Sequence, residues 1–359
     1  MRGLVAGVFS FCIGVTTSSV YCSCPSASTD ELKRCADFLD HNCRWTVDFS
    51  NMESFGRNTA SGQASLQILR TQTPYISSLG VASPFMRMIC FLPSVSTPKV
   101  AEYIADINLR KSWDENYGSF EKEKDDPIVQ STIIPYARPI EAVAGHFGVC
   151  EGDACKLEPN VQQRLVDSNF YAHRVRTGFA DYFGIADRLF FYKRNTYLYV
   201  PRSRPDAAPM VDILYDGNTR LVRAMEASGD ATSRWIERVR DEGHFEPAFM
   251  NYQHVVLVPI ADAERQLFAN SDTLKALATS GSMFDEMSSK RLYRIAKSTA
   301  AASEGEAVGV KGTLLIMTSA NEVGVPRFIP LWSQKRISAR VTLKAYEHLL
   351  LAMDRSNNE

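Results

Sequence analysis

The sequence has no excess of basic residues, no long apolar run and only six histidines. Its 40 Lys and Arg residues are balanced by 41 Asp and Glu residues, so the formal net charge is −1. Nucleic-acid-binding domains usually carry a basic excess, so this balance argues against a nucleic-acid partner. No segment after the N-terminus approaches the roughly 18 consecutive apolar residues of a membrane-spanning helix, and we therefore expect a soluble mature chain.

Common catalytic and metal-binding motifs are also missing. The sequence contains no Gly-x-Ser-x-Gly elbow, no Gly-rich phosphate loop and no His-Glu-x-x-His. It has no Cys-x-x-Cys pair and its histidines are scattered, so we expect neither a metal site nor a cofactor. We predict a protein that is not an enzyme, although His146, His173, His244 and His254 include candidates for a general base.

The first 22 residues have the order of a secretory signal peptide. Arg2 gives a positive start, residues 4–15 are mostly apolar, and Val20 and Cys22 suit the positions before a cleavage site. The alternative is a buried N-terminal strand or helix. We predict secretion, with further export or a vacuolar space as alternative destinations. No Asn-x-Ser/Thr is present, so N-glycosylation is not expected.

Six of the eight cysteines lie after the predicted cleavage site. Six cysteines allow 15 complete pairings, and sequence alone does not choose among them. Short spacing makes Cys35–Cys43 and Cys150–Cys155 plausible disulfides. Cys90 lies inside an apolar run and is typical of a buried thiol.

Hydrophobic periodicity predicts a single α+β domain over residues 23–355. Helical spacing is present at residues 30–40 and 99–109, and we expect insertions near 145–180 and 261–305. Strands are predicted at residues 64–71, 85–92, 128–136, 188–194, 196–200, 211–215, 219–225, 255–260 and 311–319.

Residues 331–353 are predicted to form a long amphipathic helix. The apolar seam of this helix has a period near 3.6 and consists of Trp332, Ala339, Leu343, Tyr346, Leu350 and Met353. Beside the seam lies a basic ridge of Arg336, Arg340 and Lys344. Such a ridge is often only a solvated face, but it could also dock on anionic lipid headgroups.

Two stretches resemble the START family, the StAR-related lipid-transfer domains. Residues 85–114 give a strand, an apolar helix and then Arg110-Lys111-Ser112-Trp113-Asp114, which is similar to the arginine-x-x-tryptophan-aspartate of that family. Residues 312–350 give a strand, a Gly-x-Pro turn and the long helix. Asp187-Arg188 before a strand is a looser similarity. With its signal peptide, the chain looks like the secreted START proteins of intracellular protozoan parasites.

The resemblance implies a helix-grip fold, in which a curved antiparallel sheet surrounds a long C-terminal helix and encloses a lipid cavity. It implies a monomer that binds one lipid and moves it between membranes, touching each membrane surface transiently. We favour a phospholipid, with a sterol or sphingolipid as alternatives. Other functions left open are lipid sequestration, binding of a partner protein, and a helix-grip hydrolase or cyclase.

Site residues follow from this resemblance. Trp113 is more typical of a core residue than of a ligand contact, and the residues of the seam are core or cavity wall. Phe328 and Trp332 could also insert into a membrane interface. A buried Arg188 could hold a lipid phosphate, although a structural pair with Asp187 is the simpler interpretation. The residues assigned to lipid binding are Arg188, Tyr192, Phe328, Trp332, Ala339, Leu343, Tyr346 and Leu350.

Overall fold

The computed structural model describes residues 34–35, 38–39, 45–51, 65–77, 80, 82–114, 117–122, 161–175, 187–201, 208–227, 229, 231–241, 245–261, 310–322, 330 and 343–355. The predicted signal peptide, the predicted strand at 128–136 and most of the predicted insertion at 261–305 lie outside these residues. So do Cys43, Cys150 and Cys155.

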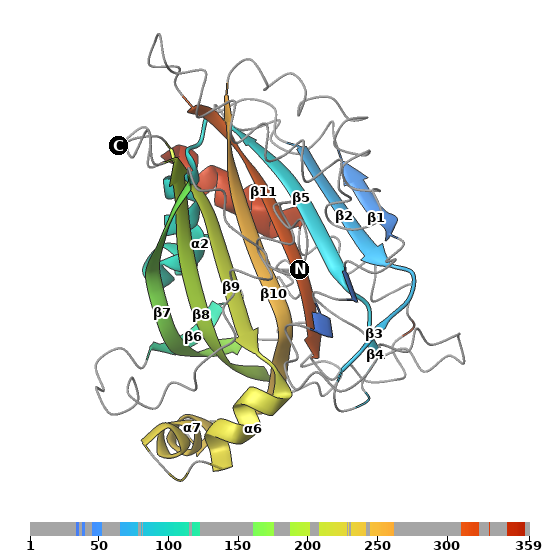
Figure 1. Ribbon diagram of the computed structural model, residues 1–359, viewed down its shortest axis with the longest axis vertical. Helices are drawn as coiled ribbons and strands as arrows, with labels where there is room; N and C mark the ends of the chain where they lie inside the picture. Colours follow the sequence, from blue (N-terminus) through green and yellow to red (C-terminus); the bar gives the residue numbers. More distant parts are fainter. Residues whose placement is uncertain are drawn as a thin grey trace, which may run out of the picture.

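One sheet of nine strands dominates the described residues (Figure 1), in the order β1-β2-β5-β11-β10-β9-β8-β7-β6. Neighbouring strands are antiparallel, and β10 makes one additional short parallel contact with β8. The strands of this sheet are β1 (Trp45–Asn51), β2 (Ser65–Thr71), β5 (Met86–Pro93), β6 (Tyr117–Lys122), β7 (Val161–Val175), β8 (Asp187–Pro201), β9 (Met210–Gly217), β10 (Phe245–Ala261) and β11 (Val310–Glu322). Two short strands, β3 (Tyr75–Ile76) and β4 (Ala82–Ser83), form a separate pair.

The central strands are buried on both faces. Every residue of β5 is buried, which explains why its sequence is a nearly continuous apolar run rather than an alternating one. The face that packs against α2 (Thr97–Ala105), α3 (Ile107–Trp113) and a helix at 343–355 is here called the inner face. Figure 1 shows α2 and the dark red C-terminal helix on the same side of the sheet.

The outer face is covered by two other groups of side chains. At one end, α6 (Thr219–Ala227) and α7 (Ala231–Asp241) pack on β7 and β8 through residues such as Trp235 and Phe191. Elsewhere Phe38 and Leu39 pack on the central strands. Gly229, with a φ of +65°, lies in the connection between α6 and α7, where a residue with a side chain would be strained.

The helix predicted at 99–109 is two helices. Asp106 has an extended backbone, which ends α2, and its carboxylate accepts hydrogen bonds from the backbone N–H groups of Asn108 and Leu109. Asp106 is therefore the N-cap of α3, and this favourable cap accounts for the break.

The prediction of a strand at 219–225 is wrong, because these residues belong to α6. Leu221, Val222 and Met225 have the i, i+1, i+4 spacing of a helix face, and all three are buried against the outer face of the sheet. Asn218 precedes the helix, and its side-chain oxygen accepts from the backbone N–H of Leu221, as expected of a helix N-terminus.

The predicted insertion at 145–180 also needs correction, because it contains β7. This strand pairs with β8 from Val161↔Pro201 to Val175↔Arg188. Its first half, Val161-Gln-Gln-Arg-Leu, has too few apolar residues for a recognisable alternating pattern. The two strands predicted at 188–194 and 196–200 are in turn a single strand, β8.

The Sγ of Cys35 is buried 3.9 Å from the backbone oxygen of Asn251. Because Cys43 lies outside the described residues, the Cys35–Cys43 disulfide stays a prediction. The prediction that Cys90 is a buried thiol is confirmed, and burial raises its pKa well above the usual value. The sheet and its helices fit the predicted helix-grip fold. The C-terminal helix is described only from residue 343, so its start at 331 stays a prediction.

Candidate ligand-binding face

The inner face can be followed as rows of cross-strand neighbours that run over β2, β5, β11, β10, β9 and β8. The first, the apolar row, has no oxygen or nitrogen in its side chains and consists of Leu66, Cys90, Leu315, Leu257, Val211 and Leu198. The next, the middle row, consists of Ile68, Met88, Met317, Val255, Ile213 and Thr196. The third, the polar row, consists of Arg70, Met86, Ser319, Gln253, Tyr215 and Arg194.

The polarity of this face therefore changes along the strand direction. Most of the six positions of the polar row carry hydrogen-bonding groups, and all of them are buried. Burying such groups is unfavourable unless they have partners, so their alignment in one row is a specific feature of the sequence.

Arg194 is the best-connected member of the polar row. One terminal nitrogen donates to the backbone oxygen of Ala105 at 2.8 Å, and the other donates to the Tyr171 hydroxyl at 2.7 Å. Its guanidinium carbon also lies 4.3 Å from the centre of the Tyr171 ring. Tyr171 stacks on Tyr192, which contacts the Tyr215 ring edge to face at 5.4 Å. The inner face thus has a ladder of three tyrosines beside a buried cation.

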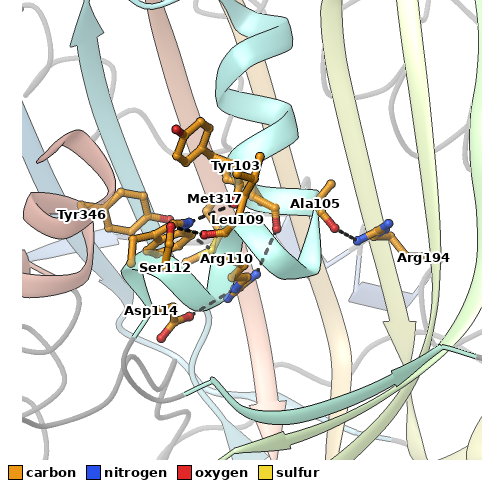
Figure 2. Close-up of polar contacts among 11 residues, drawn as sticks. Tyr103, Ala105, Leu109, Arg110, Ser112, Asp114, Arg194, Met317 and Tyr346 are labelled. Carbon is orange, nitrogen blue, oxygen red and sulfur yellow. Dashed lines mark hydrogen bonds and ion pairs between the residues drawn. The ribbon is translucent and has the colours of Figure 1, made fainter. Parts of the chain in front are cut away.

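The Arg-x-x-Trp-Asp motif closes the end of α2 (Figure 2). The last carbonyls of a helix have no partner within it and need donors from elsewhere. Here the indole N–H of Trp113 donates to Tyr103 at 3.0 Å, Arg110 donates to Ile104 at 3.5 Å, and Arg194 donates to Ala105. Arg110 is itself held by Asp114 at 3.2 Å. The motif therefore fixes the corner between α2 and α3, and Trp113 is buried there, as expected of a core residue.

The same helix holds the end of the C-terminal helix. The Lys99 ammonium donates to the backbone oxygen of Met353 at 3.2 Å, and the Tyr103 hydroxyl donates to that of Ala352 at 3.3 Å. A cation at the C-terminus of a helix also interacts favourably with the helix dipole. These two contacts form a latch between the two elements that cover the inner face.

Burial determines the ionisation of several groups on this face. It lowers the pKa of His173 well below 6.5, and the charge of Arg110 lowers it further, so the imidazole is neutral. Burial raises the pKa of Tyr346 above its usual range, while Arg110 acts in the opposite direction. The Tyr346 hydroxyl contacts the sulfur of Met317 at 3.9 Å (Figure 2).

The predicted site residues are distributed as follows. Tyr346 and Leu350 are buried, Leu343 is half-buried, and all three pack in the inner core with Tyr192. Lys344 is half-buried at the start of the described helix. Their roles in lipid binding and docking stay predictions. Five assigned residues lie outside the described residues, namely Phe328, Trp332, Arg336, Ala339 and Arg340.

Arg188 is buried, and its Nη1 lies 2.9 Å from Glu246, its cross-strand neighbour on β10. Burial lowers the pKa of Arg188, whereas the charges of Glu246 and Asp187 raise it. Glu246 is therefore a carboxylate partner of Arg188 that the sequence does not suggest. Sequence reasoning also missed Arg194, Tyr171 and Tyr215, whose proximity depends on the strand register.

A second buried polar group lies on the outer face. His254 Nε2 bonds to Asp212 Oδ1, and its other ring nitrogen lies 3.2 Å from the Tyr252 hydroxyl. The Tyr199 hydroxyl donates to the second oxygen of Asp212 at 3.5 Å. All four side chains are buried in the outer core, so we interpret this network as structural.

Among the residues that the structure describes, no three or more His, Cys, Asp or Glu side chains are grouped in a way that could hold a metal ion. No helix in the same part of the chain has the length and apolar character needed to cross a membrane.

No protein-family model and no curated protein matches the chain. Among solved structures, human STARD10 is similar over 92% of this chain and 80% of its own, with 8% identity and a TM-score of 0.40. The human StarD13 (DLC2) lipid transfer and protein localization domain is similar over 90% of this chain and 98% of its own, with 6% identity and a TM-score of 0.35. Both names are those of START proteins, the family that the two motifs resemble. Neither likeness assigns a ligand or a site residue to this chain.

Proposed function

We propose that this protein binds one lipid between the inner face and the helices that cover it, and carries that lipid between membranes. The observation that supports the proposal best is the change along the inner face from the apolar row to the polar row. A lipid has the same division into a hydrocarbon part and a polar end. No chemical step is needed for this function.

The energetics require a closed and movable cover. Each lipid CH₂ group that leaves water for an apolar site gains about 0.8 kcal/mol, so long chains need a site that excludes water almost completely. The free energy that the lipid gains in the protein must be close to the free energy that it gains in a bilayer. Otherwise the lipid would stay in the protein or in the membrane and would not be exchanged. The latch of Lys99 and Tyr103 on the C-terminal helix is our candidate for the contact that opens.

A phospholipid is the ligand that we favour from the resemblance, and the basic ridge is proposed to meet anionic headgroups during exchange. Secretion through the N-terminal signal peptide belongs to the same proposal. Sequestration of a lipid is the second candidate function, because the hydrogen bonds at both ends of α2 would also suit a tightly closed site.

The test is a transfer assay with fluorescent lipid between donor and acceptor vesicles. Leu343→Arg places a charge where the terminal helix meets the inner core and should abolish lipid uptake and transfer. Leu351→Arg is the matched control, because Leu351 lies on the same helix but outside the inner core. Background transfer of every lipid class by the wild type would refute the transfer function. A bound lipid that never exchanges would favour sequestration instead.

A further inference from the structure

Two hydroxyl groups on the inner face are buried without a hydrogen-bond partner among the described residues. They belong to Tyr215, which is 2% exposed, and to Thr196, which is 6% exposed. Tyr215 pairs with Arg194 and Thr196 pairs with Ile213, so the two residues are diagonal neighbours on adjacent strands. Buried hydroxyls normally have partners, and two such exceptions at diagonal positions of adjacent strands indicate a polar group that the protein itself does not supply.

We infer that Tyr215 and Thr196 form the polar subsite of the lipid, and that the group they take is an uncharged oxygen, either a hydroxyl or a carbonyl. This inference rests on the proposed function and specifies which part of the ligand the inner face recognises. A hydroxyl both donates and accepts, so this pair of residues suits either kind of oxygen.

The charged groups of the inner face argue against a phosphate at this subsite. Arg194 donates from both terminal nitrogens to Ala105 and Tyr171, and Arg110 is held by Asp114. A phosphate needs charge-assisted bonds of this kind, and here it would have to compete with contacts that close the end of α2. Arg70, the other arginine of the polar row, lies on β2, four strands away from Tyr215 on β9 in the sheet. Among the described residues of β8 and β9, the buried inner-face groups without a hydrogen-bond partner are the hydroxyls of Tyr215 and Thr196.

The position of the subsite also gives the ligand an orientation. Thr196 belongs to the middle row and Tyr215 to the polar row, and the apolar row lies beyond Thr196 along β8. A ligand with its oxygen at these hydroxyls can therefore lay its hydrocarbon part toward Leu198 and Val211. The opposite orientation would place hydrocarbon over Arg194.

Binding of two lipids that differ at one glycerol position, a hydroxyl in one and a phosphate in the other, tests the inference. Dioleoylglycerol and dioleoyl phosphatidic acid share their chains and ester carbonyls, and cholesterol offers a hydroxyl without an ester. We expect dioleoylglycerol to bind at least as tightly as phosphatidic acid. Tyr215→Phe and Thr196→Val should each weaken that binding about 3- to 10-fold, the effect of one neutral hydrogen bond. A parallel loss for cholesterol would identify the hydroxyl as the recognised oxygen, and its absence would identify the carbonyl.

Tyr197→Phe is the matched control, because it removes a hydroxyl from the same strand on the outer face and should leave binding unchanged. The lipid-free Tyr215→Phe protein should unfold at the wild-type temperature or above, because the deleted hydroxyl has no partner among the described residues. If it fails to fold, Thr196→Val carries the test.

Three results would overturn the inference in distinguishable ways. If the wild type binds lipid but both variants match the control, the subsite is wrong and the proposed function stands. The same conclusion follows if phosphatidic acid binds more than tenfold more tightly than dioleoylglycerol. If the wild type binds none of the three probes and carries no lipid after purification, the proposed function fails as well.

Discussion

Replacement of Trp113 by phenylalanine separates a structural role of the Arg-x-x-Trp-Asp motif from a role in ligand binding. The Trp113 indole N–H donates to the backbone oxygen of Tyr103 at 3.0 Å, and both groups are buried at the end of α2. Phenylalanine retains an aromatic ring but has no donor. Trp113→Phe should therefore destabilise the corner between α2 and α3 without changing the polarity of the inner face.

The expected loss of unfolding free energy in Trp113→Phe follows from the hydrogen bond that the variant lacks. A buried carbonyl that loses its donor costs about 1–3 kcal/mol. The smaller ring adds a packing loss of similar size, because the site relaxes only in part. Since a domain of ordinary stability has about 5–15 kcal/mol in total, the variant should show a clear shift in its urea unfolding midpoint.

Trp235→Phe provides the control for this measurement. Trp235 is also buried, but its indole N–H has no hydrogen-bond partner among the described residues. The same atoms are deleted in both variants, so Trp113→Phe should cost about 1–3 kcal/mol more than Trp235→Phe. Equal losses would refute the role of the hydrogen bond. Loss of bound lipid at unchanged stability would show that Trp113 is a ligand contact.

Three further predictions concern other parts of the molecule. Asp212→Ala should lower the unfolding free energy by about 1–3 kcal/mol, because it removes the carboxylate that His254 and the Tyr199 hydroxyl contact; a loss under about 0.5 kcal/mol in urea unfolding would contradict this. Burial and the charge of Arg110 lower the pKa of His173 in the folded chain below 6.5. As the pH falls, His173 is therefore protonated in the unfolded chain before it is protonated in the folded chain. Stability should fall below about pH 6.5 by up to about 1.4 kcal/mol per pH unit, and His173→Gln should weaken this dependence in urea titrations. Changing the basic ridge to glutamate should slow lipid transfer from anionic vesicles but spare lipid occupancy; equal wild-type rates on anionic and neutral vesicles would argue against docking.

The parts of the fold that could be predicted are those in which the hydrophobic pattern of a single segment indicates its secondary structure and its buried face. The apolar run of β5 and the seam of Tyr346 and Leu350 are examples, since each is buried as expected. β7 is not predicted, because its polar first half resembles a loop and it acquires its structure by pairing with β8. The pattern of α6 predicts a strand, because its apolar residues are few and its packing against the outer face is not local.

Most of the candidate site could not be predicted for a related reason. Arg70, Ser319, Gln253, Tyr215 and Arg194 come from five strands that are far apart in the sequence. They form one row only because the register of the whole sheet aligns them. A shift of one residue in any strand would turn its member of the row to the outer face.

The most direct test of a lipid-binding function is native mass spectrometry of the purified chain, followed by extraction and identification of what it carries. The proposed function predicts a mass increase that corresponds to one lipid per chain, and loss of this increase in Leu343→Arg but not in Leu351→Arg. A wild-type protein that carries no lipid, and takes none up from vesicles, would contradict it.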